Sequence, residues 1–309
     1  MTEIELLKNA IVGCAVGDGL GCLFEFNTVS IREFTNYYNS LEPMEVTDDT
    51  QMTLFSLEAL VHAYQAGDTS VAGVVSHLAD AYQAWYTTQL GKPNKEYYAT
   101  SRLLNYRALY ERRAPGNTCM SSLAALQEHG RVPDNDRKGN GANMRVVPLA
   151  FLNLIGIPSD SSDAMAVVTG SALITHKHPL LLELMPIQQR LMANVKGNQD
   201  FVVALGKTFE VEPPPQWLLD AMDNADTVEG WTADQALAVA IVANYRYDNF
   251  MEIMAYCICR KGDSDTIAAI AGGFWGMSGK PVPDMLWQRV REKLLIEDFL
   301  GWCSARILQ

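Results

Sequence analysis

Positive charge is scarce in this chain. Lys and Arg number 24 against 36 Asp and Glu, so the formal net charge is −12 over 309 residues. Such a surface repels a phosphate backbone, which makes nucleic acid an unlikely partner. The charge does not exclude a small phosphate-bearing ligand held by backbone amides or by metal.

Targeting and membrane signals are also lacking. The N-terminal stretch MTEIELLKN is acidic and has neither the basic start nor the apolar block of a secretory signal. The strongest apolar run, residues 236–243, is too short to cross a bilayer and is typical of a buried helix. We therefore expect no membrane association and a cytoplasmic protein.

Cysteine gives little information. Of the six cysteines, only Cys257 and Cys259 are close together, and their C-x-C spacing has no matching pair elsewhere. Without a second pair this is a weak metal signal, and reduced cysteines in the core of a cytosolic protein are the better interpretation.

Alternating strand patterns and internal repeats are absent, and helical periodicity dominates. Gly13, Gly17 and Gly21 form a row of small residues at four-residue spacing, which lets another backbone approach closely. Gly, Pro and Asn separate further helical patterns. These cover residues 52–64, 71–85, 101–112, 119–129, 164–174, 232–245, 249–259, 266–276 and 285–295.

We predict one all-α domain over residues 1–309. The share of hydrophobic residues, 48%, and of charged residues, 19%, is that of an ordinary globular protein. The clearest extended connector is the proline run at residues 212–216. A domain boundary there is a less favoured alternative.

Two carboxylate clusters precede apolar helices. In the first, Asp48 and Asp49 stand side by side between Thr47 and Thr50. An aspartate at a helix N-terminus caps free amides and is stabilised by the helix dipole. For one cluster alone, capping would be the preferred interpretation.

The second cluster changes that interpretation. Asp263 and Asp265 alternate with Ser264 and Thr266 just before another apolar helix, so the two clusters together exceed what capping needs. Hard cations such as Mg²⁺ prefer carboxylate, hydroxyl and water oxygens, and four aspartates could hold one or two of them. Calcium-loop spacing is absent. That the two clusters meet in space is a hypothesis at this stage.

A third acidic position lies in the stretch GDGLGCLFEF. If this stretch is helical, Asp18 and Glu25 lie two turns apart on one face, and solvent exposure is the simpler interpretation for both. Glu25 is nevertheless flanked by Phe24 and Phe26. A carboxylate between aromatics is a plausible base or third metal anchor.

Two glycine-rich loops and a histidine segment complete the candidates. Residues 114–118 and 138–145 precede helix-like segments, where exposed amides can cradle phosphate, although most Gly-Asn loops are simply turns. His176 and His178 are two residues apart and make a poor zinc pair. A helix-end histidine that contacts a ligand, or merely caps, is more credible.

Taken in order, these motifs resemble the ADP-ribosylglycohydrolase family. They read GDGLGCLFEF, TDDTQMTL, PGNTCMSSLAAL, GNGANMRVVPLA, SALITHKHP and GDSDTIAAIAGGFWG, and they span most of the chain. The resemblance implies a compact multi-helix orthogonal bundle with a two-metal cleft. It also implies hydrolysis of the glycosidic bond between ADP-ribose and a protein side chain, with arginine favoured and serine possible.

The resemblance also implies roles for single residues. The metal ligands would be Thr47, Asp48, Asp49, Asp263, Asp265 and Thr266, holding two Mg²⁺ ions with Mn²⁺ as a possible substitute. Glu25 and Asp49 would be catalytic, with Glu25 as the leading general acid/base. Substrate would contact Gly116, Asn117, Thr118, Asn140, Gly141 and His176. We expect an ADP-ribosylated protein as substrate and a monomeric enzyme.

The sequence departs from the family pattern at three places. Arg260 and Lys261 replace the commoner glycines before the second cluster. With Arg112 and Arg113 they could form a basic rim that meets pyrophosphate or an acidic partner, although a solvated surface patch is the default interpretation. Asn143 stands where a small residue is usual. The loop at residues 112–118 lacks a carboxylate, which weakens the transfer of arginine specificity.

Two alternatives stay open at this point. A binding module could retain ADP-ribose in the same cleft without hydrolysing it. A structural all-α protein could use its aspartates only as helix caps. The full acidic set argues against the first, and the presence of two clusters argues against the second.

Overall fold

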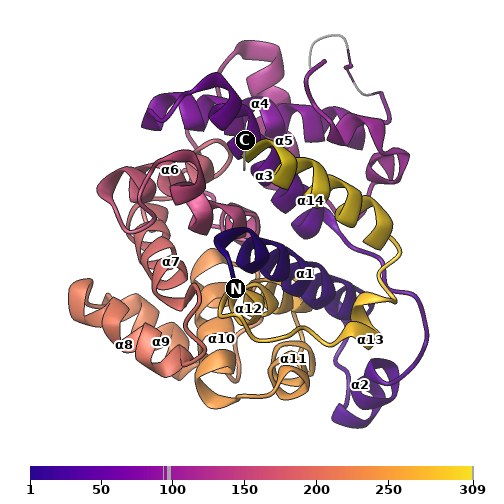
Figure 1. The fold of residues 1–309 in the computed structure, drawn as a ribbon. Coiled ribbons are helices and arrows are strands. Elements are labelled where there is room, and N and C mark those ends of the chain that lie inside the picture. Colours follow the sequence, from indigo (N-terminus) through magenta and orange to yellow (C-terminus); the bar gives the residue numbers. More distant parts are fainter. Residues whose placement is uncertain (93, 96–98, 308–309) are drawn as a thin grey trace.

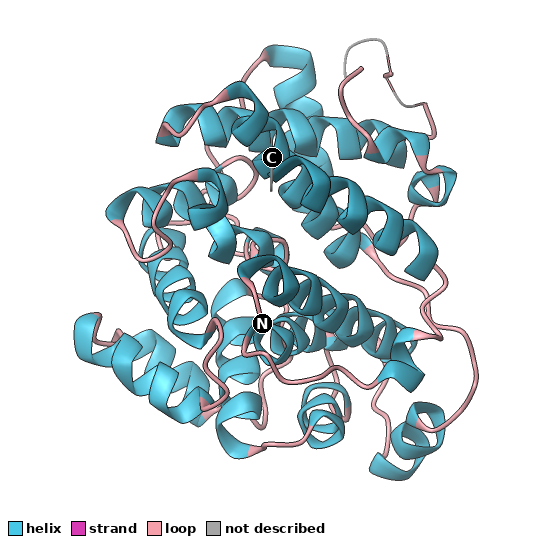
Figure 2. Ribbon diagram, in the orientation of Figure 1, coloured by secondary structure: helices cyan, strands magenta, loops and turns pink. Residues whose placement is uncertain are grey.

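The chain is built of helices, as expected. A computed structural model describes residues 1–92, 94–95 and 99–307, and within these ranges it has no strand, only two isolated bridges that pair Met44 with Val290 and Gly139 with Thr232 (Figures 1 and 2). The all-α prediction is therefore confirmed. The α-helices are α1 Glu3–Gly21, α2 Ile31–Tyr38, α3 Asp48–Ala66, α4 Val71–Gln89, α5 Asn117–His129, α6 Ser162–Leu173, α7 Leu181–Val195, α8 Phe201–Val211, α9 Gln216–Asp223, α10 Ala233–Arg246, α11 Phe250–Ile258, α12 Ser264–Met277, α13 Asp284–Trp287 and α14 Lys293–Ile307. The short 3₁₀ helices are η1 Cys22–Phe24, η2 Leu103–Asn105, η3 Arg107–Tyr110, η4 Asn140–Ala142 and η5 Val147–Ile155.

Helices α1 and α12 form the central pair. They run antiparallel, since Gly13 of α1 faces Gly272 of α12 and Gly21 faces Asp265. A Cβ atom at Gly13 would lie 2.1 Å from the carbonyl oxygen of Gly272, so the two backbones touch without side chains between them. The glycine row predicted from the sequence is the surface of this contact.

Helix α1 corrects one expectation. The segment Glu3–Phe24 is 22 residues long with a mean hydropathy of 1.3, so by length and composition it could cross a membrane, which residues 236–243 could not. Within the protein it is a core helix, and 72% of its most apolar window is buried. A helix that is apolar on all sides is expected at the centre of a large helical core.

The other helices surround this pair. Helix α3 packs against α4, α14 and η5, and α10 and α11 pack against α12 (Figure 1). Gly67 ends α3 in the left-handed conformation, with φ +66°. Nearly the whole length contributes to one continuous cluster of buried apolar side chains. The single-domain organisation stays a prediction.

Two helices predicted from the sequence are not found as single helices in the structure. Residues 101–112 form only the turns η2 and η3, because the buried carboxylate of Glu58 accepts the backbone N–H groups of Arg102 and Leu103. Residues 285–295 are divided between α13 and α14. The segment between them pairs with Met44, whose N–H donates to the Arg289 carbonyl at 2.8 Å.

The α1–α12 contact predicts a large effect for Gly17→Ala. The added methyl group would lie 2.1 Å from the Ala268 carbonyl oxygen, which is backbone and cannot move aside. We expect the free energy of unfolding to fall by about 3 kcal/mol, measured by urea denaturation. Gly206→Ala in α8 is the matched control, because nothing lies within 4 Å of its added Cβ. A loss in Gly17→Ala no greater than in that control would contradict the close packing.

Candidate metal-binding active site

The two carboxylate clusters meet in one cavity of about 330 Å³. Helices α3 and α12 both begin there, so the early and late aspartates face each other across it. The convergence expected from the sequence is therefore observed. The cavity is lined by Glu25, Phe26, Asp48, Asp49, Ala114, Pro115, Gly116, Asn117, Thr118, Cys119, Gly139, Asn140, Gly141, Met144, His176, Trp231, Asp263, Asp265 and Thr266.

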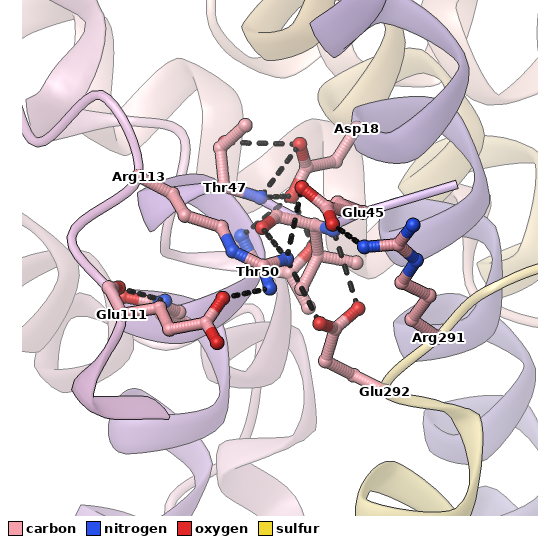
Figure 3. A network of polar contacts seen from close by, with 10 residues as sticks. Asp18, Glu45, Thr47, Thr50, Glu111, Arg113, Arg291 and Glu292 are labelled. Carbon is pink, nitrogen blue, oxygen red and sulfur yellow. Dashed lines mark hydrogen bonds and ion pairs between the residues drawn. The ribbon is translucent and has the colours of Figure 1, made fainter. Parts of the chain in front are cut away.

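The start of α3 is anchored by Asp18 from α1 (Figure 3). The carboxylate of Asp18 accepts the backbone N–H and the hydroxyl of both Thr47 and Thr50. Asp18 is 0% exposed, so the expectation that it faces solvent is wrong. These bonds fix the direction in which the following residues, Asp48 and Asp49, project.

Ligand oxygens gather in two groups. Those of Asp18, Asp49 and Asp265 lie within 4.8 Å of one another, and so do those of Glu25, Asp263 and Asp265. Asp265 belongs to both groups, so one carboxylate could serve two neighbouring cations. Because the oxygens of Asp18 already accept four donors, we interpret Asp18 as the support of this cluster and Asp49 as the residue that presents free oxygen to it.

The remaining predicted ligands lie around these groups. The hydroxyl oxygen of Thr47 lies 2.9 Å from Asp18 and 3.0 Å from Asp49, so its single proton is shared between the two carboxylates, and Thr47 does not line the cavity. Its hydroxyl oxygen keeps a lone pair. The Asp48 carboxylate accepts the Gly116 N–H at 3.0 Å, and Thr266 lines the cavity beside Asp265.

Burial and mutual repulsion raise the pKa values of these carboxyl groups. The pKa of Asp49 lies well above its usual value because of burial and the charges of Asp18, Asp48 and Asp263. Asp48 and Asp265 are raised well above their usual pKa for the same two reasons. Burial raises the pKa of Asp18 to about 6. The pKa of Glu25 rises to about 7 through burial and the nearby Asp263 and Asp18.

The donor set fits divalent cations. No Lys or Arg is among the residues that line the cavity, although five carboxylates are. One oxygen of Asp49, Oδ1, is buried without a hydrogen-bond partner, and such an atom costs free energy unless something satisfies it. Capping does not explain the set either, since the side chain of Asp263 makes no capping bond although it stands at the N-cap of α12.

The glycine loops and His176 also line the cavity. Asn140 donates to the Gly230 carbonyl at 2.9 Å and to Asp263 at 2.7 Å, so it ties the loop to the second cluster. Asn117 and Thr118 begin α5 and line the cavity. His176 follows α6, is 2% exposed and faces the same space.

The four basic residues near the two clusters do not reach the cavity. The Arg113 guanidinium pairs with Glu292 at 2.8 Å and with Glu111 at 2.6 Å, and it donates to the Val46 carbonyl (Figure 3). It therefore holds the loop before α3 and does not meet a ligand. Arg260 donates to the backbone oxygens of residues 225, 228 and 256. None of the four basic residues lines the cavity.

Asn143 also lies away from the cavity. It is 0% exposed, and its amide donates to the Ala233 carbonyl at 3.1 Å. The expectation that this departure alters ligand contacts is therefore not supported by its position. Its role is to join the loop to α10.

Sequence reasoning missed an aromatic pair at the cavity. Phe26 and Trp231 stack with ring centroids 5.3 Å apart and planes 21° apart. Phe26 has a φ of +69°, which is unusual for a residue other than glycine, and is 67% exposed. Phe26 was visible only as a neighbour of Glu25, and no pattern around Trp231 marks it.

Comparisons with known proteins agree with the resemblance. A profile of the ADP-ribosylglycohydrolase family matches residues 2–308. The ADP-ribosyl-[dinitrogen reductase] glycohydrolase of Rhodospirillum rubrum is 25% identical over 292 residues, which cover 85% of this chain and 82% of that protein. ADP-ribosylhydrolase ARH3 of Mus musculus is 24% identical and covers 99% of this chain and 93% of its own. A solved structure titled "ADP-ribosylglycohydrolase-related protein complex" has a TM-score of 0.69 at 20% identity, covering 99% of both chains, and shows the same fold.

The raised pKa values predict an unusual pH dependence without metal. A carboxyl group whose pKa is higher in the folded than in the unfolded state binds more protons when folded, so its stabilisation is lost as pH rises through the folded pKa. Since Glu25 and Asp18 have values of about 7 and 6, the metal-free protein should have a Tm roughly 5 °C lower at pH 8 than at pH 5.5.

Millimolar Mg²⁺ should restore much of this loss at pH 8 and little at pH 5.5, where protons compete with it. Glu58, whose pKa burial raises to about 7, contributes a similar slope that Mg²⁺ does not remove. Asp49→Asn should abolish the response to Mg²⁺, whereas Glu128→Gln, at an exposed position of α5, should keep it. An equal Mg²⁺ response in both variants would argue against the site.

Proposed function

The chain belongs to the ADP-ribosylglycohydrolase family, and we propose that it is a Mg²⁺-dependent enzyme that removes ADP-ribose from a modified protein side chain, with arginine as the favoured acceptor. A glycohydrolase acting on ADP-ribosylated substrates is what its family and relatives indicate. Mg²⁺-dependent hydrolysis is supported above all by the two groups of carboxylates, which have Asp265 in common.

The proposed cation ligands are the oxygens of Asp48, Asp49, Asp263 and Asp265, with the hydroxyls of Thr47 and Thr266 beside them. Bound cations would supply positive charge to polarise ribose oxygens and lower the pKa of water. Mg²⁺ suits this all-oxygen set, and Mn²⁺ is a possible substitute.

Side chains around the cavity would catalyse the cleavage and bind the rest of the substrate. Cleavage at the anomeric carbon of the ribose passes through an oxocarbenium-like state. Glu25 lies at the edge of the carboxylate cluster on the segment that leads to the exposed Phe26, so it can reach both the sugar and solvent. We assign Glu25 as the general base for water, while Asp49 and Asp265 stabilise charge. The loops around Gly116 and Asn140 would hold the rest of the ADP-ribose.

The aromatic pair supports an arginine acceptor. A guanidinium is planar and cationic, and it stacks on aromatic faces. Phe26 and Trp231 offer such a face at the cavity beside Glu25. The same surface gives a serine hydroxyl no comparable partner.

We also propose a cytoplasmic monomer. The six cysteines are all unpaired in the structure, which suits a reducing compartment. The charge of −12 supports a protein substrate over nucleic acid.

Release of free ADP-ribose from arginine-modified and serine-modified proteins tests the activity directly. We expect turnover with Mg²⁺ and none with a chelator. Asp49→Asn and Asp265→Asn should each lower kcat by roughly 100-fold or more, whereas Glu128→Gln should leave it unchanged. If the protein binds ADP-ribose but releases none from either substrate, it is a binding module; wild-type kcat in both aspartate variants would refute the metal assignment.

Acceptor choice has its own test. Trp231→Ala and Phe26→Ala should each lower kcat/KM for arginine-linked substrate by about tenfold, because the stacking face is lost. Serine-linked substrate should change less. Leu23→Ala is the control, since Leu23 is 55% exposed on the same segment and does not line the cavity. Equal losses on both substrates would argue against recognition of the acceptor by this pair.

A further inference from the structure

Arg145 is a buried cation that the proposed chemistry leaves unexplained. Its side chain is 0% exposed, and its guanidinium packs 4.2 Å above the ring of Tyr82. Its hydrogen-bond acceptors are neutral. Nη2 donates to the Ser171 carbonyl and to the Thr175 hydroxyl, both at 2.8 Å, and Nη1 lies 3.6 Å from Sγ of Cys119 and 3.9 Å from Sδ of Met52. Its Nε is buried without a partner. A buried charge with only neutral partners is costly, so the position needs a reason beyond packing.

The contacts of Arg145 lead to the cavity. Oγ1 of Thr175 lies 2.8 Å from Nδ1 of His176, and the imidazole of His176 lines the cavity. The backbone of Thr175 is held in place, because its carbonyl accepts the Ser122 hydroxyl at 2.7 Å and the Asn135 amide at 3.2 Å. Guanidinium, hydroxyl and imidazole therefore form a rigid series that ends at the cavity.

The direction of the hydrogen bonds in this series follows from the donor inventory. A guanidinium can only donate, so one lone pair of the Thr175 oxygen is used by Arg145. The hydroxyl proton then has three acceptors available: Nδ1 of His176 at 2.8 Å, the Ala172 carbonyl at 3.5 Å and the sulfur of Cys119, which is a weak acceptor. The shorter contact is the stronger one, and the adjacent positive charge makes the hydroxyl a better donor. Nδ1 is thus an acceptor, and the ring proton resides on Nε2.

The other edge of the ring faces the glycine loop. A Cβ atom at Gly141 would lie 3.2 Å from Cε1 of His176 and 2.9 Å from Sγ of Cys119, and one at Gly139 would lie 3.3 Å from Nε2. The two glycines therefore let the loop approach the Nε2–Cε1 edge closely. A ligand held by this loop meets that edge.

We infer that Arg145 is a positioning residue which, through Thr175, fixes His176 as a neutral imidazole with its proton on Nε2, a permanent donor to an acceptor oxygen of the bound ligand. On the proposed function, that oxygen belongs to the phosphate or ribose of ADP-ribose. His176 then neither transfers a proton in the reaction nor ligates a metal through Nε2.

The electrostatic surroundings agree with this assignment. Burial and the charge of Arg145 lower the pKa of His176 to about 3. Cys119, which faces the same edge from α5, is a neutral thiol at physiological pH, because burial raises its pKa to about 11. His176 therefore stays neutral between pH 5 and pH 8.

The first test uses ligand-free protein, so it does not depend on the substrate being correct. Long-range ¹H–¹⁵N correlation spectra show the tautomer of each histidine, and His176→Gln assigns the signal. We expect the Nε2–H pattern for His176 with no titration between pH 8 and pH 5. Thr175→Val should change the pattern toward the other tautomer, and Thr175→Ser should preserve it. An Nδ1–H pattern or a titrating signal in the wild type would overturn the inference, and this spectrum decides even if Thr175→Val does not fold.

The second test is a double-mutant cycle with ADP-ribose as the ligand. Thr175→Val should raise the Kd by roughly tenfold, because an acceptor nitrogen then faces a ligand oxygen. Thr175→Ser should restore binding. In a His176→Gln background, Thr175→Val should have no further effect. A full tenfold loss in that background would show that Thr175 does not act through His176. Absence of ADP-ribose binding in the wild type would instead contradict the proposed function and leave the spectra to decide the tautomer.

Discussion

The approach of α1 to α12, backbone against backbone, sets the geometry on which the candidate site depends. Gly13, Gly17 and Gly21 bring the two helices so close that the Ser264 hydroxyl donates to the Gly21 carbonyl at 3.0 Å. This contact places Asp18, near the end of α1, beside Asp265, near the start of α12. Aspartates that are more than 200 residues apart in sequence are therefore held close together by the two helix backbones.

Asp18 connects this helix pair to α3, the third helix of the site. By accepting both the amide and the hydroxyl of Thr47 and Thr50, it positions the start of α3 from a distant part of the chain. A buried carboxylate with this many donors is well satisfied. Its neighbour Asp49 is not, since its Oδ1 has no hydrogen-bond partner, and burial together with the charges around it raises the pKa of Asp49. Rigid walls around like charges are what make the cavity suitable for cations.

The sequence was most informative where a local pattern has one physical meaning. The glycine row indicated a close contact between two helices. The paired aspartates before two helices indicated a cation site, because two such pairs exceed what helix capping needs. Helical periodicity did not indicate α2, α7, α8 or α9. Residues 101–112 were expected to form a helix, because the sequence does not show that Glu58 accepts hydrogen bonds from their backbone amides. The burial of Asp18 and the place of Trp231 were likewise invisible, because both depend on neighbours remote in sequence.

The partners of α1 also determine when its apolar surface can be covered during synthesis. Its glycine face is complementary to α12, which ends at Met277, so nearly the whole chain must leave the ribosome before the two can meet. Roughly 250 residues separate them, which at ordinary elongation rates corresponds to about 10 to 50 seconds. Until then the side of α1 that faces α12, in a segment of membrane-spanning length and hydropathy, lacks the helix that covers it in the folded protein.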